Sequence, residues 1–122
     1  MPLYICGAPG STLSDDQRRR IAEAITRIHC DVTGAPAMFA HVVFDESKTE
    51  YSVFGSIRAG RSEETKAALK QQMAEAVAAV VGVDAAKVMV FTMDVPASWV
   101  MEGGVLLPEP GEEDDWLAAH GE

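Results

Sequence analysis

No apolar run in the 122 residues approaches the roughly 18 residues that a membrane-spanning helix requires. The first residues, Met-Pro-Leu-Tyr-Ile-Cys, lack the basic segment of an export signal. Cysteine is scarce, and Cys6 and Cys30 are too few for a disulfide framework. These absences predict a cytoplasmic protein that has no membrane contact and keeps both cysteines as reduced thiols.

Positive charge is also scarce, because 10 Lys and Arg face 19 Asp and Glu, which gives a net charge of −9. Such a chain repels phosphate backbones, so nucleic acid is excluded as the expected partner. No Lys or Arg follows Gly103, whereas six acidic residues do: Glu109, Glu112, Glu113, Asp114, Asp115 and Glu122. We expect a solvated acidic tail that Trp116 and Leu117 hold against an apolar surface.

A repeat becomes visible when the sequence is shifted against itself by 48 positions. Several residues then coincide, among them four pairs: Gly7 with Gly55, Ser14 with Ser62, Gly34 with Gly82, and Ala37 with Ala85. In each copy a short β-favouring run (3–6 and 51–54) precedes a helical stretch, and a second run (39–44 and 87–93) follows it. This order predicts a β-α-β unit that occurs twice.

The two helical stretches have recognisable beginnings, faces and ends. Ser14 and Ser62 each precede acidic residues, so the serine caps a free N–H and the acids lie at the positive end of the helix dipole. Apolar residues recur at spacings of four, three and four in both stretches: Ile21, Ile25, Ile28, Val32 and Leu69, Met73, Ala76, Val80. Gly34 and Gly82 stand where a left-handed cap ends a helix.

We therefore predict an α/β (α+β) fold, a tandem β-α-β pseudo-dimer in a single domain of residues 1–122. The repeat halves span about 2–46 and 50–94, and residues 95–122 form a C-terminal turn and the acidic tail. Pairing the halves gives a four-stranded mixed sheet with two helices on one face, and self-association would bury the other face. If the runs 3–6 and 51–57 pair antiparallel, the N-terminus lies near Arg58 and Arg61.

Two motifs at that end carry candidate chemistry. Removal of Met1 would leave Pro2 with a secondary amine, a good proton carrier, although a proline at this position is also often inert. Arg58 and Arg61 flank a glycine directly before a helix, where paired guanidinium groups can hold a carboxylate. Alternatively, both arginines form ordinary surface ion pairs with the acids of residues 63–64.

Two further residues are candidates. His29 lies at the edge of the first apolar stripe, where a neutral imidazole can donate to a substrate carboxylate or take part in a local hydrogen bond. Glu102 ends an expected helical turn over 96–102, either solvated or as a base that activates water. His29 and Cys30 lack a second ligand pair at proper spacing, so we expect no metal.

Pro2, the duplicated β-α-β unit and the string Arg-Ala-Gly-Arg-Ser at 58–62 resemble the tautomerase superfamily. Within it the chain is similar to the cis-3-chloroacrylic acid dehalogenase group over residues 2 to about 111, also through the strings at 28–34, 96–102 and 107–111. The resemblance implies a tautomerase/MIF-like pseudo-dimer that forms a homotrimer and acts without a cofactor on a small carboxylate.

The resemblance also implies roles for individual residues. Pro2 would be the proton-transfer amine, Arg58 and Arg61 would bind and polarise the substrate carboxylate, and His29 would assist that binding. Glu102 would activate water for addition to an unsaturated acid. With a 3-haloacrylate, addition of water gives a halohydrin that loses halide and ends as malonate semialdehyde.

The sequence departs from that dehalogenase pattern in two places. Phe91 stands where the group has a tyrosine that assists the water-activating glutamate, and the link Asp45–Glu50 between the second and third strands is short. We therefore expect another unsaturated or enolisable carboxylate as the substrate. Open alternatives are keto–enol tautomerisation of a phenylpyruvate-type 2-oxo acid, decarboxylation of malonate semialdehyde, and a non-catalytic trimeric binding protein.

Overall fold

The computed structural model describes residues 2–37 and 40–120. Two β-α-β units follow each other along the chain, as the repeat predicts: β1 Leu3–Pro9, α1 Asp15–Thr33 and β2 His41–Lys48, then β3 Ser52–Arg58, α2 Glu63–Val81 and β4 Met89–Val95. A 3₁₀ turn, η2 (Ala85–Lys87), precedes β4. The C-terminal segment contains the 3₁₀ turn η3 (Ala97–Trp99), the short strands β5 (Met101–Glu102) and β6 (Val105–Leu106), and the helix α3 (Glu113–His120).

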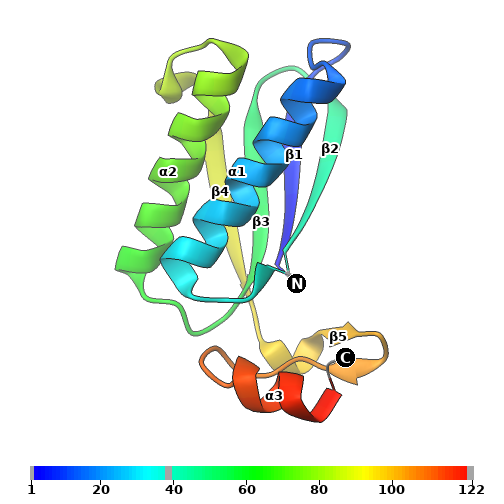
Figure 1. Cartoon of the computed structure of the whole chain (residues 1–122). Coiled ribbons are helices and arrows are strands. Elements are labelled where there is room, and N and C mark those ends of the chain that lie inside the picture. Colours follow the sequence, from blue (N-terminus) through cyan, green and yellow to red (C-terminus); the bar gives the residue numbers. More distant parts are fainter. Residues whose placement is uncertain (1, 38–39, 121–122) are drawn as a thin grey trace.

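The four long strands form one mixed sheet in the order β2-β1-β3-β4. Within each unit the strands are parallel, and the two units meet through the antiparallel pair β1 and β3. Both long helices cover the same face of this sheet, and the C-terminal segment lies beyond one of its ends (Figure 1). The predicted fold class and the antiparallel joining of the halves are confirmed.

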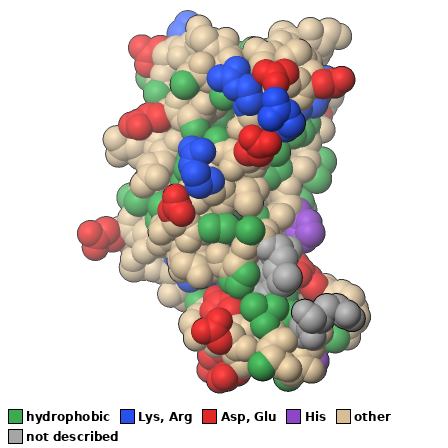
Figure 2. Space-filling view, viewed as in Figure 1, with side chains coloured by type: hydrophobic (Ala, Val, Ile, Leu, Met, Phe, Trp, Pro, Cys, Tyr) green, Lys and Arg blue, Asp and Glu red, His purple; other side chains and the backbone are tan. Residues whose placement is uncertain are grey.

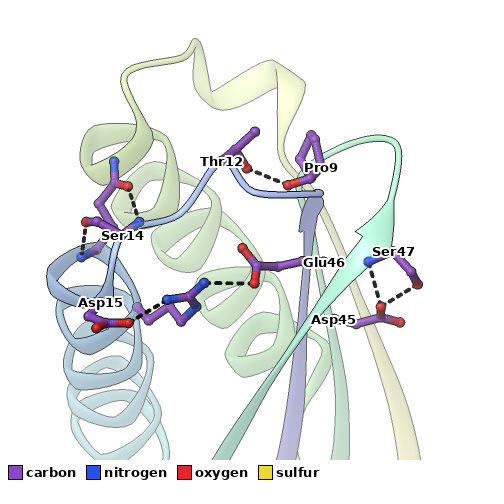
Figure 3. Close-up of polar contacts among 9 residues, drawn as sticks. Pro9, Thr12, Ser14, Asp15, Asp45, Glu46 and Ser47 are labelled. Carbon is purple, nitrogen blue, oxygen red and sulfur yellow. Dashed lines mark hydrogen bonds and ion pairs between the residues drawn. The ribbon is translucent and has the colours of Figure 1, made fainter.

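The helix signals act as predicted. The side chain of Ser14 accepts a hydrogen bond from the Gln17 N–H, and the Gln17 side chain accepts one from the Ser14 N–H, which forms a complete capping box (Figure 3). Gly34 and Gly82 end the helices with φ of 76° and 77°. Only glycine adopts this left-handed conformation at little cost, so these two residues set the helix ends.

The core lies between the sheet and the two helices. Alternate residues of β1 and β3 point to the helices, so Tyr4, Cys6, Val53 and Ile57 are fully buried. The helices contribute their apolar stripes to the same cluster: Ile21, Ile25, Ile28, Leu69, Met73, Val77 and Ala78.

The strand boundaries differ from the predicted runs, and the difference at β2 changes the link to β3. β2 begins at His41, and the earlier part of the predicted run, Phe39, lies outside the described residues. β2 continues through Lys48 because β1 pairs with it up to Pro9, past an irregularity in the register. The link to β3 therefore consists of residues 49–51. The prediction that it spans Asp45–Glu50 was wrong.

The C-terminal segment is more ordered than predicted. The helical turn ends at Trp99, and Glu102 lies in a hairpin that turns at Gly103 and Gly104, both with positive φ (59° and 79°). The expected solvated tail folds into α3 instead. Its Trp116 indole N–H donates to the Leu106 carbonyl oxygen at 2.6 Å, which holds the helix on the hairpin.

The other face of the sheet carries exposed apolar side chains: Leu3, Val43, Phe54, Met89, Phe91 and Met93. The helix face is different, since basic and acidic side chains are interspersed over α1 and α2 and acidic ones gather on the C-terminal segment (Figure 2). Within the described residues, no helix is both long and apolar enough to cross a membrane.

Candidate active site

The antiparallel pairing of β1 with β3 brings the chain start to the arginine motif. Leu3 is the partner of Ser56, so Pro2, one residue earlier, lies beside the last residues of β3 before Arg58. Pro2 is fully buried, and its carbonyl oxygen accepts a hydrogen bond from the His41 N–H at 3.0 Å. The predicted proximity of Pro2 to the end of β3 is therefore present in the fold.

Arg58 lies at the end of β3 with its side chain only 1% exposed. Its Nη1 donates to the carbonyl oxygen of Pro108 at 2.6 Å, and its Nη2 donates to Oε1 of Glu113 at 2.8 Å. The other carboxylate oxygen of Glu113 accepts from the Gly111 N–H at 2.8 Å. Arg58 thus binds the C-terminal segment to the sheet. From the sequence, surface ion pairs and carboxylate binding were considered for Arg58, but not this contact.

The Glu113 carboxylate is stabilised in its charged form by this pairing. Burial acts to raise the pKa of Glu113, but the hydrogen bond and charge of Arg58 and the backbone N–H groups outweigh it and hold the pKa below its usual value. An acidic residue of the expected solvated tail is therefore a buried structural partner. Sequence reasoning missed Glu113 because nothing distinguishes it from the acids beside it.

Arg61 follows in the loop between β3 and α2. It is half-buried, and its Nη1 donates to the carbonyl oxygen of Thr33 at the end of α1, 3.2 Å away. Burial and the neighbouring charge of Arg58 lower the pKa of Arg61. The two guanidinium groups therefore lie close enough for the charge of one to act on the other.

His29 lies on the last turns of α1 and is 2% exposed. Its Nδ1 is 2.7 Å from the Tyr4 hydroxyl, and among the described residues its Nε2 is buried without a hydrogen-bond partner. Burial, with the charges of Arg61 and Arg58, lowers the pKa of His29 to about 4, so the imidazole is neutral near pH 7. Tyr4 is a further residue that the sequence did not single out.

Glu102 approaches the same end of the sheet from the hairpin. Its Oε1 lies 3.6 Å from Nε2 of His41, the residue whose backbone N–H contacts Pro2. His41 therefore contacts both residues, Glu102 through its side chain and Pro2 through its backbone N–H. No partner for His41 could be predicted from the sequence, because a single histidine at a strand start carries no local signal.

Phe91 is the one candidate that lies elsewhere. It is 48% exposed on the open face of the sheet, where it lines a hollow together with Ile5, Phe54 and Met89. Its partner in β3 is Phe54, four residues before Arg58. One copy of the chain therefore does not bring Phe91 to Pro2.

The arrangement suits a small carboxylate. Guanidinium groups and a neutral imidazole with a buried nitrogen are donors that match carboxylate oxygens, and their cationic surroundings oppose the net negative charge of the chain. Among residues 2–37 and 40–120, no three His, Cys, Asp or Glu side chains are grouped so as to hold a metal ion.

Comparison with known proteins gives the family. Residues 1–120 match the family described as "Putative oxalocrotonate tautomerase enzyme", and the chain belongs to this family of the tautomerase superfamily. Within the superfamily it is similar in structure to N1, a member of the cis-3-chloroacrylic acid dehalogenase (cis-CaaD) family. That match has 28% identity and a TM-score of 0.88, and it covers 96% of this chain and 91% of N1. The predicted resemblance is confirmed.

Two other structures are similar over most of the chain. Ps01740 is 42% identical with a TM-score of 0.78, over 83% of this chain and all of its own. A fused 4-OT described as an asymmetric trimer is 24% identical with a TM-score of 0.78, over 86% of this chain and 95% of its own, which shows a common fold. No curated protein matches the sequence.

The Arg58–Glu113 pair predicts a pH-dependent attachment of α3. Because the folded-state pKa of Glu113 is lowered, its stabilising effect is complete above the unfolded-state pKa near 4.5 and is lost as the pH falls through the folded-state value. Glu113→Gln keeps an acceptor but removes the charge, and should destabilise α3 by about 1–3 kcal/mol at pH 7. Amide hydrogen exchange of residues 113–120 measures this, with exposed Glu112→Gln as the matched control. Equal exchange in the two variants would contradict the assigned pair.

Proposed function

We propose that the protein is a cofactor-independent enzyme that transfers protons through the amine of Pro2 to or from a small unsaturated or 2-oxo carboxylate. The observation that carries the proposal is the burial of Pro2 at the end of the sheet where Arg58, Arg61 and His29 also lie. An amine becomes available there only if Met1 is removed. In that setting a single nitrogen can act as acid or base beside a carboxylate-binding group of residues.

The two arginines and His29 would have different roles in binding. Arg61 and the Nε2 of His29 would contact the substrate carboxylate directly. Arg58 already has Glu113 as an ion-pair partner, so the substrate carboxylate either displaces Glu113 or senses Arg58 through its charge. Binding of the carboxylate near these groups would also polarise a conjugated double bond or an adjacent carbonyl group.

In a hydration reaction, Glu102 would remove a proton from water as the oxygen adds to the carbon distant from the carboxylate. Protonated Pro2 would then deliver its proton to the carbon next to the carboxylate, which completes the addition of H and OH. A 3-haloacrylate would give a halohydrin, which releases halide and a proton to leave malonate semialdehyde. His41 lies beside Glu102 and could assist it in place of the tyrosine hydroxyl, which is absent because position 91 is a phenylalanine.

Tautomerisation of a 2-oxo acid is the second candidate, supported by the description of the matched family as an oxalocrotonate tautomerase. It needs neutral Pro2 to take a proton from carbon, and it needs no activated water. Decarboxylation of malonate semialdehyde requires the same cations. A binding protein without catalysis remains the alternative of another class, and retention of Met1 would favour it.

The open face of the sheet supports a homotrimer. Exposed Leu3, Phe54, Phe91 and Met93 form an apolar surface of the kind that oligomerisation buries, and a fused 4-OT of the same fold is a trimer. In a trimer, Phe91 of one copy could reach the Pro2 end of another.

The assembly is tested by native mass spectrometry. The parent should have three times the 13.1 kDa chain mass, and Phe54→Glu should shift it to the monomer because the charge would be buried in the interface. Glu64→Gln, on the helix face, serves as the control and should keep the parental mass. A monomeric parent at micromolar concentration would rule out the trimer.

Catalysis is tested with cis-3-chloroacrylate, phenylpyruvate and malonate semialdehyde as substrates, after intact mass has established whether Met1 is absent. Pro2→Ala should lower kcat/KM at least about 100-fold for every substrate that the parent converts, because the freely rotating primary amine of alanine replaces the secondary amine that the proline ring holds in position. Pro9→Ala, at the far end of β1, should leave it unchanged. Equal turnover by Pro2→Ala and parent would refute the proposal.

The pH profile of kcat/KM in the same experiment separates the two reactions. Hydration needs protonated Pro2, so activity should fall above its pKa. Tautomerisation needs the neutral amine, so activity should fall below it.

A further inference from the structure

Tyr4 and His29 form a buried pair whose position the sheet determines. Tyr4 lies opposite Gly55 in the β1–β3 pairing, and a Cβ at Gly55 would lie 2.5 Å from Cε1 of the tyrosine ring. Glycine therefore leaves the space that the ring needs. The ring meets the His29 imidazole edge to face, with centroids 5.6 Å apart and planes inclined by 66°. The hydroxyl and Nδ1 come within 2.7 Å of each other.

The protons of this pair can be arranged in two ways. If the Tyr4 hydroxyl donates to Nδ1, the imidazole proton is on Nε2, and this N–H is the one polar hydrogen of the Tyr4–His29 pair left without a partner among the described residues. If Nδ1–H donates to Tyr4, both the phenolic proton and the Nε2 lone pair lack partners there. Each buried unpaired group lowers stability, because its lost hydrogen bond to water is not replaced. The first arrangement is therefore favoured.

The surroundings support the same arrangement. Burial raises the pKa of the Tyr4 hydroxyl, so it keeps its proton, and burial with the charges of Arg61 and Arg58 lowers the pKa of His29 to about 4. A neutral imidazole beside two guanidinium groups faces a positive environment. An N–H in such a place has an anionic oxygen as its natural acceptor.

We propose that Tyr4 is a positioning residue, whose hydroxyl holds His29 in the Nε2–H tautomer so that this N–H donates to an oxygen of the substrate carboxylate. The inference rests on the proposed function and deepens it. A carboxylate oxygen that bonds to Nε2 satisfies a donor that has no hydrogen-bond partner among residues 2–37 and 40–120. To reach it, the substrate must displace the atoms that cover Nε2.

The C-terminal segment is in a place to control that access. Arg58 holds the Pro108 carbonyl oxygen, and the Pro110 ring lies 3.6 Å from the position that a Cβ of Gly60 would take. These contacts bring residues 108–110 over the arginine motif. A substrate carboxylate at Arg61 and His29 would therefore lie beneath this segment, away from bulk water, where its hydrogen bonds are strongest.

The tautomer is tested by ¹⁵N NMR of the full-length protein labelled at histidine, at pH 7.5. The parent should show His29 with a proton on Nε2 and a bare Nδ1. Tyr4→Phe removes only the hydroxyl and should shift His29 to a mixture of tautomers or to the Nδ1–H form. Tyr51→Phe is the matched control, since Tyr51 is the other tyrosine of the chain, and it should leave the spectrum of His29 unchanged.

Kinetics on the converted carboxylate provide the second readout. Tyr4→Phe should raise KM about tenfold while kcat changes much less, because a hydrogen bond to the bound carboxylate is lost in part of the population. Tyr51→Phe should have parental values. A packing role alone would lower stability without moving the tautomer or separating KM from kcat.

A parent spectrum with the proton of His29 on Nδ1 overturns the inference, whether or not the variant folds. An unchanged tautomer and an unchanged KM in Tyr4→Phe overturn it as well. The NMR result does not depend on turnover. If catalysis depends on Pro2 but His29 carries its proton on Nδ1, the proposed function stands and this inference is refuted. An Nε2–H tautomer that Tyr4→Phe abolishes supports the inference even where Pro2→Ala has refuted the proton-transfer role.

Discussion

The antiparallel pairing of β1 with β3 is the constraint on which the site depends. It places the start of the first strand against the end of the third, and so brings Pro2 to the arginine motif across more than fifty residues of sequence. The same pairing sets Tyr4 opposite Gly55, which gives the tyrosine ring the room to reach His29. A shift of one residue in this register would turn Tyr4 to the open face and remove its contact with α1.

Charge is distributed unevenly in this acidic protein, which leaves a cationic region at one end of the sheet. The net charge of −9 is concentrated in the C-terminal segment, whereas Arg58 and Arg61 lie together at the end of the sheet. Glu113 compensates Arg58 inside the protein, which explains how a guanidinium group with 1% exposure is tolerated there. In the proposed function, Arg61 and the neutral His29 are then the residues that would donate to the substrate carboxylate.

Local sequence signals were sufficient for the repeated unit. Capping serines, helical periodicity and left-handed glycines are interactions within a few residues, and Ser14, Gly34 and Gly82 act as these patterns predict. The hairpin around Glu102, the helix α3 and the Arg58–Glu113 pair were not predictable in this way. They depend on contacts between residues far apart in the chain, such as Trp116 with Leu106 across the hairpin and Arg58 with Glu113 across the molecule.

In the candidate site, too, some contacts were predictable from the sequence and others depend on the packing of distant elements. The meeting of Pro2 with the arginine motif followed from the expected strand pairing, whereas the contacts of Tyr4 with His29 and of His41 with Glu102 arise only once the elements pack. The roles assigned to Pro2, His29, Arg58, Arg61, Phe91 and Glu102 in catalysis and binding stay predictions. Phe91 in particular can take part only through another copy of the chain.

The central claim is that the Pro2 nitrogen is a titrating amine that carries the reacting proton. The most direct measurement is ¹⁵N NMR of protein labelled at its six prolines, recorded as a function of pH. Prolines within the chain are tertiary amides without an N–H and do not titrate. The account predicts one titrating proline nitrogen, with a midpoint that coincides with a pKa in the kcat/KM profile. The absence of any titrating proline nitrogen, or a midpoint missing from that profile, would contradict it.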